Sequence, residues 1–151
     1  MSSIFSITTE GAEAVTTAAE TVLQLVSAAN MKPYIVGWGV SFDGATSTAV
    51  PVLVELMHQS TAGTSAAVTN IVKLDLDNPT ALGTGRKQFS AEPTTTTAIE
   101  QHLVHPQGGN LIREYPPGRE PTLGDATTDR FGIRITAPAA VNVRAWIQWA
   151  E

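Results

Sequence analysis

Alternation of large and small side chains with a period of two is the feature of this sequence that most restricts its fold. In Tyr34–Phe42, large apolar side chains alternate with Gly37, Gly39 and Ser41. Successive side chains of a β-strand point to opposite faces. The pattern therefore predicts a strand that packs one face on a core and is approached closely at its glycine face.

The same alternation predicts further strands, each bounded by residues typical of turns. They are Val50–His58, Ala67–Leu74, Thr97–His105, Leu111–Tyr115, Asp129–Ala137 and Val141–Ala150. Short strands separated by turns at roughly 8–12-residue intervals are typical of β-sandwiches and barrels. We therefore expect an all-β, antiparallel β-sandwich. We favour a jelly-roll-like sandwich, although the strand order does not follow from the sequence.

The segment Glu10–Asn30 fits two structures. Its apolar residues recur at helical spacing, whereas the run Val22–Val26 and the nearby threonines favour a strand. Because the rest of the chain reads as β, we expect a strand at about Thr21–Ser27. The resulting division is an extended N-terminal arm over residues 1–20 and a single β-sandwich domain over 21–151. A long loop at about 75–97 is expected, with one short strand near Lys87–Ala91.

Composition and charge exclude several classes of protein. The chain has 151 residues, 9 Lys and Arg against 14 Asp and Glu, and a net charge of −5. Phosphate recognition needs clustered basic residues, and here only Arg86 and Lys87 are adjacent, so we expect no nucleic-acid partner. The absence of cysteine excludes disulfides and cysteine-ligated metal sites.

The apolar segments indicate where the protein is made. No apolar run approaches the ~20 residues that span a bilayer. The first residues lack the basic start and apolar stretch of a secretory signal. We therefore expect no membrane partner and assembly in a cytoplasm.

Residues with catalytic or metal-binding potential form no recognisable motif. The three histidines are His58, His102 and His105, and the last two would point to opposite faces of a strand. Gly83–Lys87 lacks the spacing of a phosphate loop. No serine stands in a nucleophile motif. We predict that the protein is not an enzyme and has no metal or cofactor site.

The last strand carries the strongest candidate for a binding surface. Val143, Ala145, Ile147 and Trp149 share one face of Val141–Ala150, which leaves Arg144, Trp146 and Gln148 on the other. An outward tryptophan beside an arginine is the composition of an interface anchor. It is also the composition of a surface on which a sugar ring stacks. We favour a subunit interface over packing beneath a loop and over a ligand site.

Several segments together resemble a family of small, cysteine-free, virion-associated proteins of tailed bacteriophages. The resemblance covers most of the chain from about residue 20 onward and consists of turns and core strands. The segments are Val36–Gly44, Val52–Leu56 with Thr61–Thr64, His105–Gly108, Tyr115–Glu120 and Gly132–Ala139. These motifs bring no catalytic residues with them.

The resemblance implies a structural component of a phage particle, and a head decoration (cement) protein fits the size and the all-β pattern best. Such a protein implies two partners: copies of itself, as a homo-oligomer that we expect to be a trimer, and the major capsid protein. The implied location is the capsid exterior, after assembly in the host cytoplasm. Phe5 in the arm, together with Arg86 and Lys87 in the long loop, is a candidate contact with neighbouring subunits.

Two alternatives differ from this reading. The chain could instead form a major jelly-roll shell subunit or a tail or baseplate component. It could also be a carbohydrate- or receptor-binding module that uses Trp146.

Overall fold

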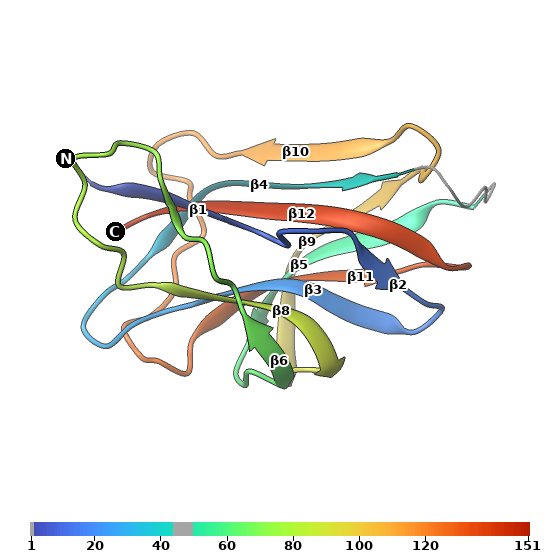
Figure 1. Ribbon diagram of the computed structural model, residues 1–151, viewed down its shortest axis with the longest axis horizontal. Coiled ribbons are helices and arrows are strands. Elements are labelled where there is room, and N and C mark those ends of the chain that lie inside the picture. The colour runs from blue at the N-terminus through green and yellow to red at the C-terminus, as the bar shows by residue number, and fades with distance from the viewer. Residues whose placement is uncertain (1, 44–49) are drawn as a thin grey trace.

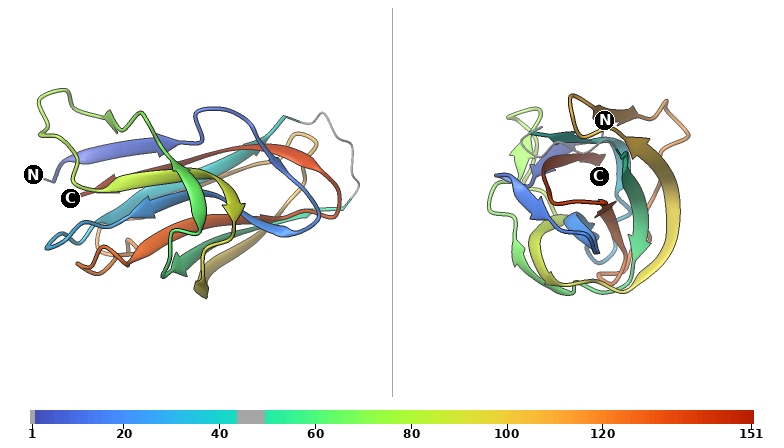
Figure 2. Two further views of the ribbon diagram at one scale, coloured as in Figure 1. Left: turned by 60° about the horizontal axis from the view of Figure 1, so that its bottom comes forward. Right: turned by 90° about the vertical axis from the view of Figure 1, so that its right-hand side faces the viewer.

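Two antiparallel β-sheets packed against each other form the protein, as the β-sandwich prediction states (Figure 1). The computed structural model describes residues 2–43 and 50–151. The described residues include no helix, and therefore none that is long and apolar enough to cross a membrane. Both ends of the chain lie at the same end of the sandwich (Figure 2), where Ser3 and Glu151 exchange two backbone hydrogen bonds.

The first sheet has the strand order β10-β4-β12-β1-β7, and β2 also pairs with β12. Its strands are β1 (Ile4–Thr8), β2 (Glu13–Val15), β4 (Tyr34–Phe42), β7 (Val72–Lys73), β10 (Asn110–Glu114) and β12 (Val141–Ala150).

The second sheet has the order β6-β8-β3-β11-β5-β9. Its strands are β3 (Ala19–Val26), β5 (Val52–Gln59), β6 (Thr64–Ala67), β8 (Thr84–Ala91), β9 (Thr95–Val104) and β11 (Arg130–Thr136). β10 and β4 lie at the top of Figure 1, whereas β8 and β6 lie at the bottom.

The core lies between the sheets and uses the apolar faces that the alternation predicts. Trp149 and Ile147 of β12, Trp38 of β4 and Phe131 of β11 are fully buried. Burying one large apolar side chain contributes about 1.5–3 kcal/mol, so this layer is the main source of stability. β4 has the bounds that the sequence predicts; Gly44, in the turn expected after it, lies outside the described residues.

One residue of β4 departs from simple alternation. Ile35, placed with the glycines by the sequence pattern, is fully buried in the core. The pairing of β4 with β12 shifts at this point, from Gly37 opposite Gln148 to Ile35 opposite Trp149. The extra residue, Val36, is a β-bulge that reverses which side chains face inward.

The N-terminal segment is not an arm, so that prediction is wrong. β1 lies between β12 and β7 in the first sheet, and β2 pairs with β12. Phe5 and Ile7 are fully buried, and the Phe5 ring lies 5.6 Å from the Trp149 ring. Burial of these two side chains holds the segment in the sandwich without any neighbouring subunit.

The remaining strand predictions differ mainly at their boundaries. The strand expected at about Thr21–Ser27 is β3, so the segment 10–29 forms strands and no helix. The strand expected at Ala67–Leu74 is wrong: the chain passes from β6 in the second sheet to β7 in the first. Within the loop expected at 75–97, β8 is longer than predicted, and β9 begins there as well.

Candidate functional site

The outer face of the first sheet carries the surface predicted around Trp146. The strand register places Ile112 of β10, Gly39 of β4, Trp146 of β12 and Thr8 of β1 in one row across the sheet. In the next row, Arg144 lies beside Ser41. Trp146 thus faces outward while Trp149 is buried, as the alternation predicts.

The indole of Trp146 lies directly on the glycines of β4. A Cβ atom added to Gly39 would be 2.7 Å from Trp146 Nε1, and one added to Gly37 would be 3.5 Å from the Trp146 ring. Glycine in a strand interior costs roughly 0.5–1 kcal/mol relative to alanine, and here it provides room for the ring. The close approach predicted at the glycine face is made by this side chain of the same protein.

Two open hollows flank Arg144 on this face. One, of about 250 Å³, lies between Thr8, Arg144 and Trp146. The other, of about 130 Å³, lies between Phe42, Asn142 and Arg144. An exposed guanidinium beside a half-buried indole can bind a carboxylate or carbonyl of a partner while the ring supplies apolar contact.

The other predicted interface residues lie in different places. Gln148 is half-buried on the same outer face, opposite Ser6 of β1. Phe5 is buried in the core and is wrong as an interface residue. Arg86 lies half-buried on β8, opposite Gln24 of the second sheet. Trp146, Arg144 and Gln148 are therefore together, and Phe5 and Arg86 are apart from them.

Lys87 belongs to an ion pair that closes one edge of the sandwich. Its ammonium group bonds the carboxylate of Glu10. Glu10 also accepts backbone hydrogen bonds from Thr69 and Asn70, at 2.9 and 2.7 Å. Lys87, followed by the Thr69 hydroxyl and the backbone N–H of Asn70, lowers the pKa of Glu10 to about 2. The predicted surface contact of Lys87 is thus replaced by a contact within the chain.

A second carboxylate closes the opposite edge, where β9 and β10 are the outermost strands. Glu100 accepts two hydrogen bonds from the Arg113 guanidinium, at 2.9 and 3.0 Å, and lies 3.1 Å from His102. Arg113 is the main cause that lowers the pKa of Glu100 to about 2. Next to this pair, the buried Trp38 indole donates to the Tyr115 hydroxyl at 3.0 Å, and burial raises the pKa of Tyr115 to about 12.

The Glu100 pair predicts a loss of stability in acid. The pKa of Glu100 is lower in the folded chain than its ordinary value of 4.5. The unfolded chain therefore binds more protons, and the free energy of unfolding falls as the pH drops from about 4.5 toward 2. We expect the free energy of unfolding, measured with urea, to fall less between pH 5 and pH 3 for Glu100→Gln than for the wild type. Equal losses would mean that the pair adds no net stability.

Segments that follow β5 and β8 cover part of the second sheet's outer face. Gln24 and Gln59 are buried there and bonded to each other at 2.7 Å, and Gln24 also donates to the carbonyl of Thr61. Glu92 accepts three hydrogen bonds from Thr21. Most of these buried polar atoms are paired, as stability requires, whereas Gln24 Oε1 accepts no hydrogen bond from the described residues. The two outer faces therefore differ, since the corresponding face of the first sheet exposes Arg144 and Ile112.

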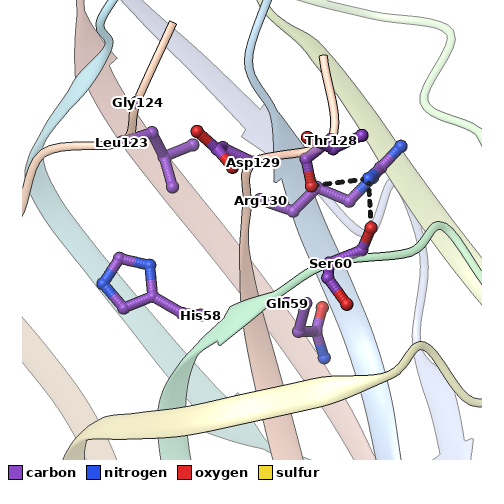
Figure 3. Close-up of a pocket in the computed structure, with 8 residues that line it drawn as sticks. All are labelled: His58, Gln59, Ser60, Leu123, Gly124, Thr128, Asp129 and Arg130. Carbon is purple, nitrogen blue, oxygen red and sulfur yellow. Dashed lines mark hydrogen bonds between the residues drawn. The ribbon is translucent and has the colours of Figure 1, made fainter. Parts of the chain in front are cut away.

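One pocket, at the end of β5 and the start of β11, contains side chains with catalytic potential. It has a volume of about 320 Å³ and is lined by His58, Asp129 and Arg130, among others (Figure 3). The Arg130 guanidinium donates to the carbonyls of Ser60 and Thr128 at 3.1 and 2.8 Å, as the dashed lines show. Burial lowers the pKa of Arg130.

The geometry of this pocket supports a structural role. The His58 ring packs on Phe131 at 4.9 Å between centroids, and Arg130 joins two loops through their backbones. Within 2–43 and 50–151, no group of three or more His, Asp or Glu side chains is arranged to hold a metal ion.

The two edge pairs are among the polar contacts that the sequence does not predict. Glu10 is 77 residues from Lys87, and Glu100 is 13 residues from Arg113. No local pattern connects such pairs. His102 and His105 are also separated: His102 packs near Trp38, and His105 is exposed beyond the end of β9.

Comparison with protein-family models, with curated protein sequences and with solved structures finds no match to this chain.

Proposed function

We propose that the protein is a decoration protein of a phage head, which binds the outside of the shell and stabilises contacts between capsid subunits. The observation that carries the proposal is the outer face of the first sheet. It is broad and sparsely charged, with Arg144 and Glu114 among Trp146, Ile112 and several small residues. Sparse charge is typical of the centre of a protein–protein interface.

The strand order supports a jelly roll. Without the short strands β2, β6, β7 and β8, the sheets read β10-β4-β12-β1 and β9-β5-β11-β3. Along the chain, successive strands change sheets at each step except between β5 and β9, and the last strand lies beside the first. Connections of this kind support our proposal of a double-sheet jelly roll, an arrangement that is common in capsid proteins. Fold alone does not define function, so this observation is supporting.

We place the contacts between copies of the protein on the outer face around Trp146, Arg144 and Gln148. A ring seated on glycine backbone is already immobilised, so binding loses little side-chain entropy there. The hollow beside Arg144 can receive a side chain of the neighbouring copy. Closed symmetry, of which the proposed trimer is one case, then repeats each contact and increases the total binding strength.

The proposal predicts that purified protein rebinds shells from which it has been removed. We expect rebound shells to resist heat better than stripped ones, because each bound oligomer joins several subunits. Quantitative staining of virions should give many copies per head, and sedimentation of the purified protein should give an oligomer. A virion that lacks the protein but keeps its heat resistance would contradict the proposal.

The alternative roles give different results in the same measurements. A tail or baseplate component would be present in few copies per particle, and a major shell subunit would build the shell alone. A carbohydrate-binding module that uses Trp146 would bind a glycan array, and this binding would be lost in Trp146→Ala. If the protein binds glycans and does not bind shells, the carbohydrate-binding role replaces our proposal.

A further inference from the structure

The loop between β7 and β8 carries the most exposed large apolar side chain of the described residues, Leu76. Residues 74–83, which we call the Leu76 loop, contain Leu74, Leu76 and Leu82, with exposed fractions of 50%, 88% and 62%. The loop lies at the end of the sandwich that carries both ends of the chain (Figure 2). Clustered exposed apolar side chains mark interaction surfaces.

Hydrogen bonds hold the Leu76 loop in shape at both ends. At its start, Leu74 donates its backbone N–H to the carbonyl of Ile4 at 3.0 Å. At its end, the Glu151 carboxylate accepts the backbone N–H groups of Leu82 and Gly83 at 2.7 and 3.1 Å. The same carboxylate accepts the indole N–H of the buried Trp149 at 3.1 Å. The leucines are therefore presented by a fixed backbone, which lowers the entropy lost on binding.

The tip of the loop is a turn with two exposed carboxylates. The carboxylate of Asp75 accepts a hydrogen bond from the backbone N–H of Asp77 at 3.0 Å. The backbone carbonyl of Asp75 accepts a hydrogen bond from the backbone N–H of Asn78. The nearby cation, Lys73, donates to the carbonyl of Asn78 at 2.7 Å. Both carboxylates thus flank Leu76, and the tip is acidic as well as apolar.

A hollow lies beside this tip. It has a volume of about 310 Å³ and is lined by Ser2, Ile4, Leu74, Asp75 and Asn78. It is large enough to receive an apolar side chain of a partner. The loop therefore combines a projecting leucine, a neighbouring hollow and an acidic rim.

The acidic charge of the Leu76 loop indicates whether its partner is a second copy of this chain or a different protein. A partner for this tip needs an apolar groove with basic residues at its rim. Lys87, Arg113 and Arg134 are bonded to carboxylates within the chain, and Lys73 and Arg130 donate to backbone carbonyls. Of the other basic residues, Arg86 lies near Arg130, whereas Lys32, Arg119 and Arg144 lie on separate segments. The arginine pair that a second copy offers is half-buried, and its Arg130 already donates to the carbonyls of Ser60 and Thr128. A second copy therefore offers no freely exposed basic cluster.

We infer that the Leu76 loop is the part of the molecule that docks on the shell, where Leu76 enters an apolar groove rimmed by lysine or arginine. This inference rests on the proposed function and adds the surface and the chemistry of the partner. It leaves the face around Trp146 for contacts between copies.

The test compares two aspartate variants for binding to purified shells that lack the protein. Leu76→Asp should bind on the order of 30-fold more weakly or worse, as for an interface hot spot. Leu103→Asp is the matched control, because Leu103 is 72% exposed on β9, and it should bind like the wild type. Neither change removes a buried contact, so thermal unfolding should be unchanged in both.

A third variant tests the basic rim. Asp77→Asn should weaken binding and reduce its dependence on salt, because a screened charge pair is lost. Binding by Leu76→Asp at wild-type strength would overturn the inference and leave the proposed function intact. A change of oligomeric state in Leu76→Asp would instead assign the loop to a second copy. Failure of the wild-type protein to bind shells would overturn both.

Discussion

Gly39→Ala is expected to lower the free energy of unfolding by about 3 kcal/mol, at the upper end of the range for overpacked sites. The new methyl group would lie 2.5 Å from the carbonyl oxygen of Leu111 and 2.7 Å from Trp146 Nε1. The first of these atoms belongs to the backbone of β10, so relief requires that strand to move. Urea unfolding measures the loss, and hydrogen exchange should show that the amides of β10 lose protection first.

Gly11→Ala is the matched control for this substitution. No atom lies within 4 Å of a Cβ added to Gly11, so we expect a change of no more than about 0.5 kcal/mol. Adding Trp146→Ala to Gly39→Ala should recover only part of the loss, because the contact with Leu111 persists. Full recovery in the double variant would show that the ring, and not β10, makes glycine necessary here.

Arg134→Met is expected to destabilise the protein by about 3–5 kcal/mol, because it leaves a buried carboxylate without its cation. Glu55 is 2% exposed on the second sheet and accepts bonds from Arg134 at 2.8 and 2.7 Å. Gln101 donates a further bond to Glu55 at 2.6 Å. In a chain of this size the loss corresponds to a fall in Tm of roughly 2–4 °C for each kcal/mol.

A second substitution separates the unpaired charge from the lost packing. Glu55→Gln combined with Arg134→Met should recover at least half of the stability that Arg134→Met loses, because an amide costs less to bury than an unpaired carboxylate. Arg119→Met, at an exposed position after β10, should be near neutral. A loss below 1 kcal/mol in Arg134→Met would mean that water reaches Glu55.

The sequence is most informative where alternation is long and regular. Nine residues of β4 and ten of β12 are found as predicted, and the two faces of β12 are assigned correctly. A close approach to the β4 glycines is also predicted, although the sequence does not identify Trp146 as the side chain that makes it. A long pattern is needed to assign the faces of a strand, because a register shift of one residue moves every side chain to the opposite face of the sheet.

Short or distant contacts account for what the sequence does not predict. Ile4–Ile7 alternates over too few residues to be distinguished from a polar arm, and its partner strand is near the other end of the chain. The bulge at Val36 leaves no local signal, so Ile35 was placed on the wrong face. For the candidate site, the grouping of Trp146, Arg144 and Gln148 follows from one strand, whereas the Leu76 loop depends on its bonds to Ile4 and Glu151.

The position of β1 between β12 and β7 has a consequence for synthesis on the ribosome. Thr9 bonds to Ala145, 136 residues further along the chain. The first sheet cannot close until β12 has left the exit tunnel, so Phe5 and Ile7 remain without their partner strand until then. Sheets closed by such distant pairings fold in milliseconds to seconds. Until β12 is available, the nascent chain depends on its scarcity of long apolar runs to avoid aggregation.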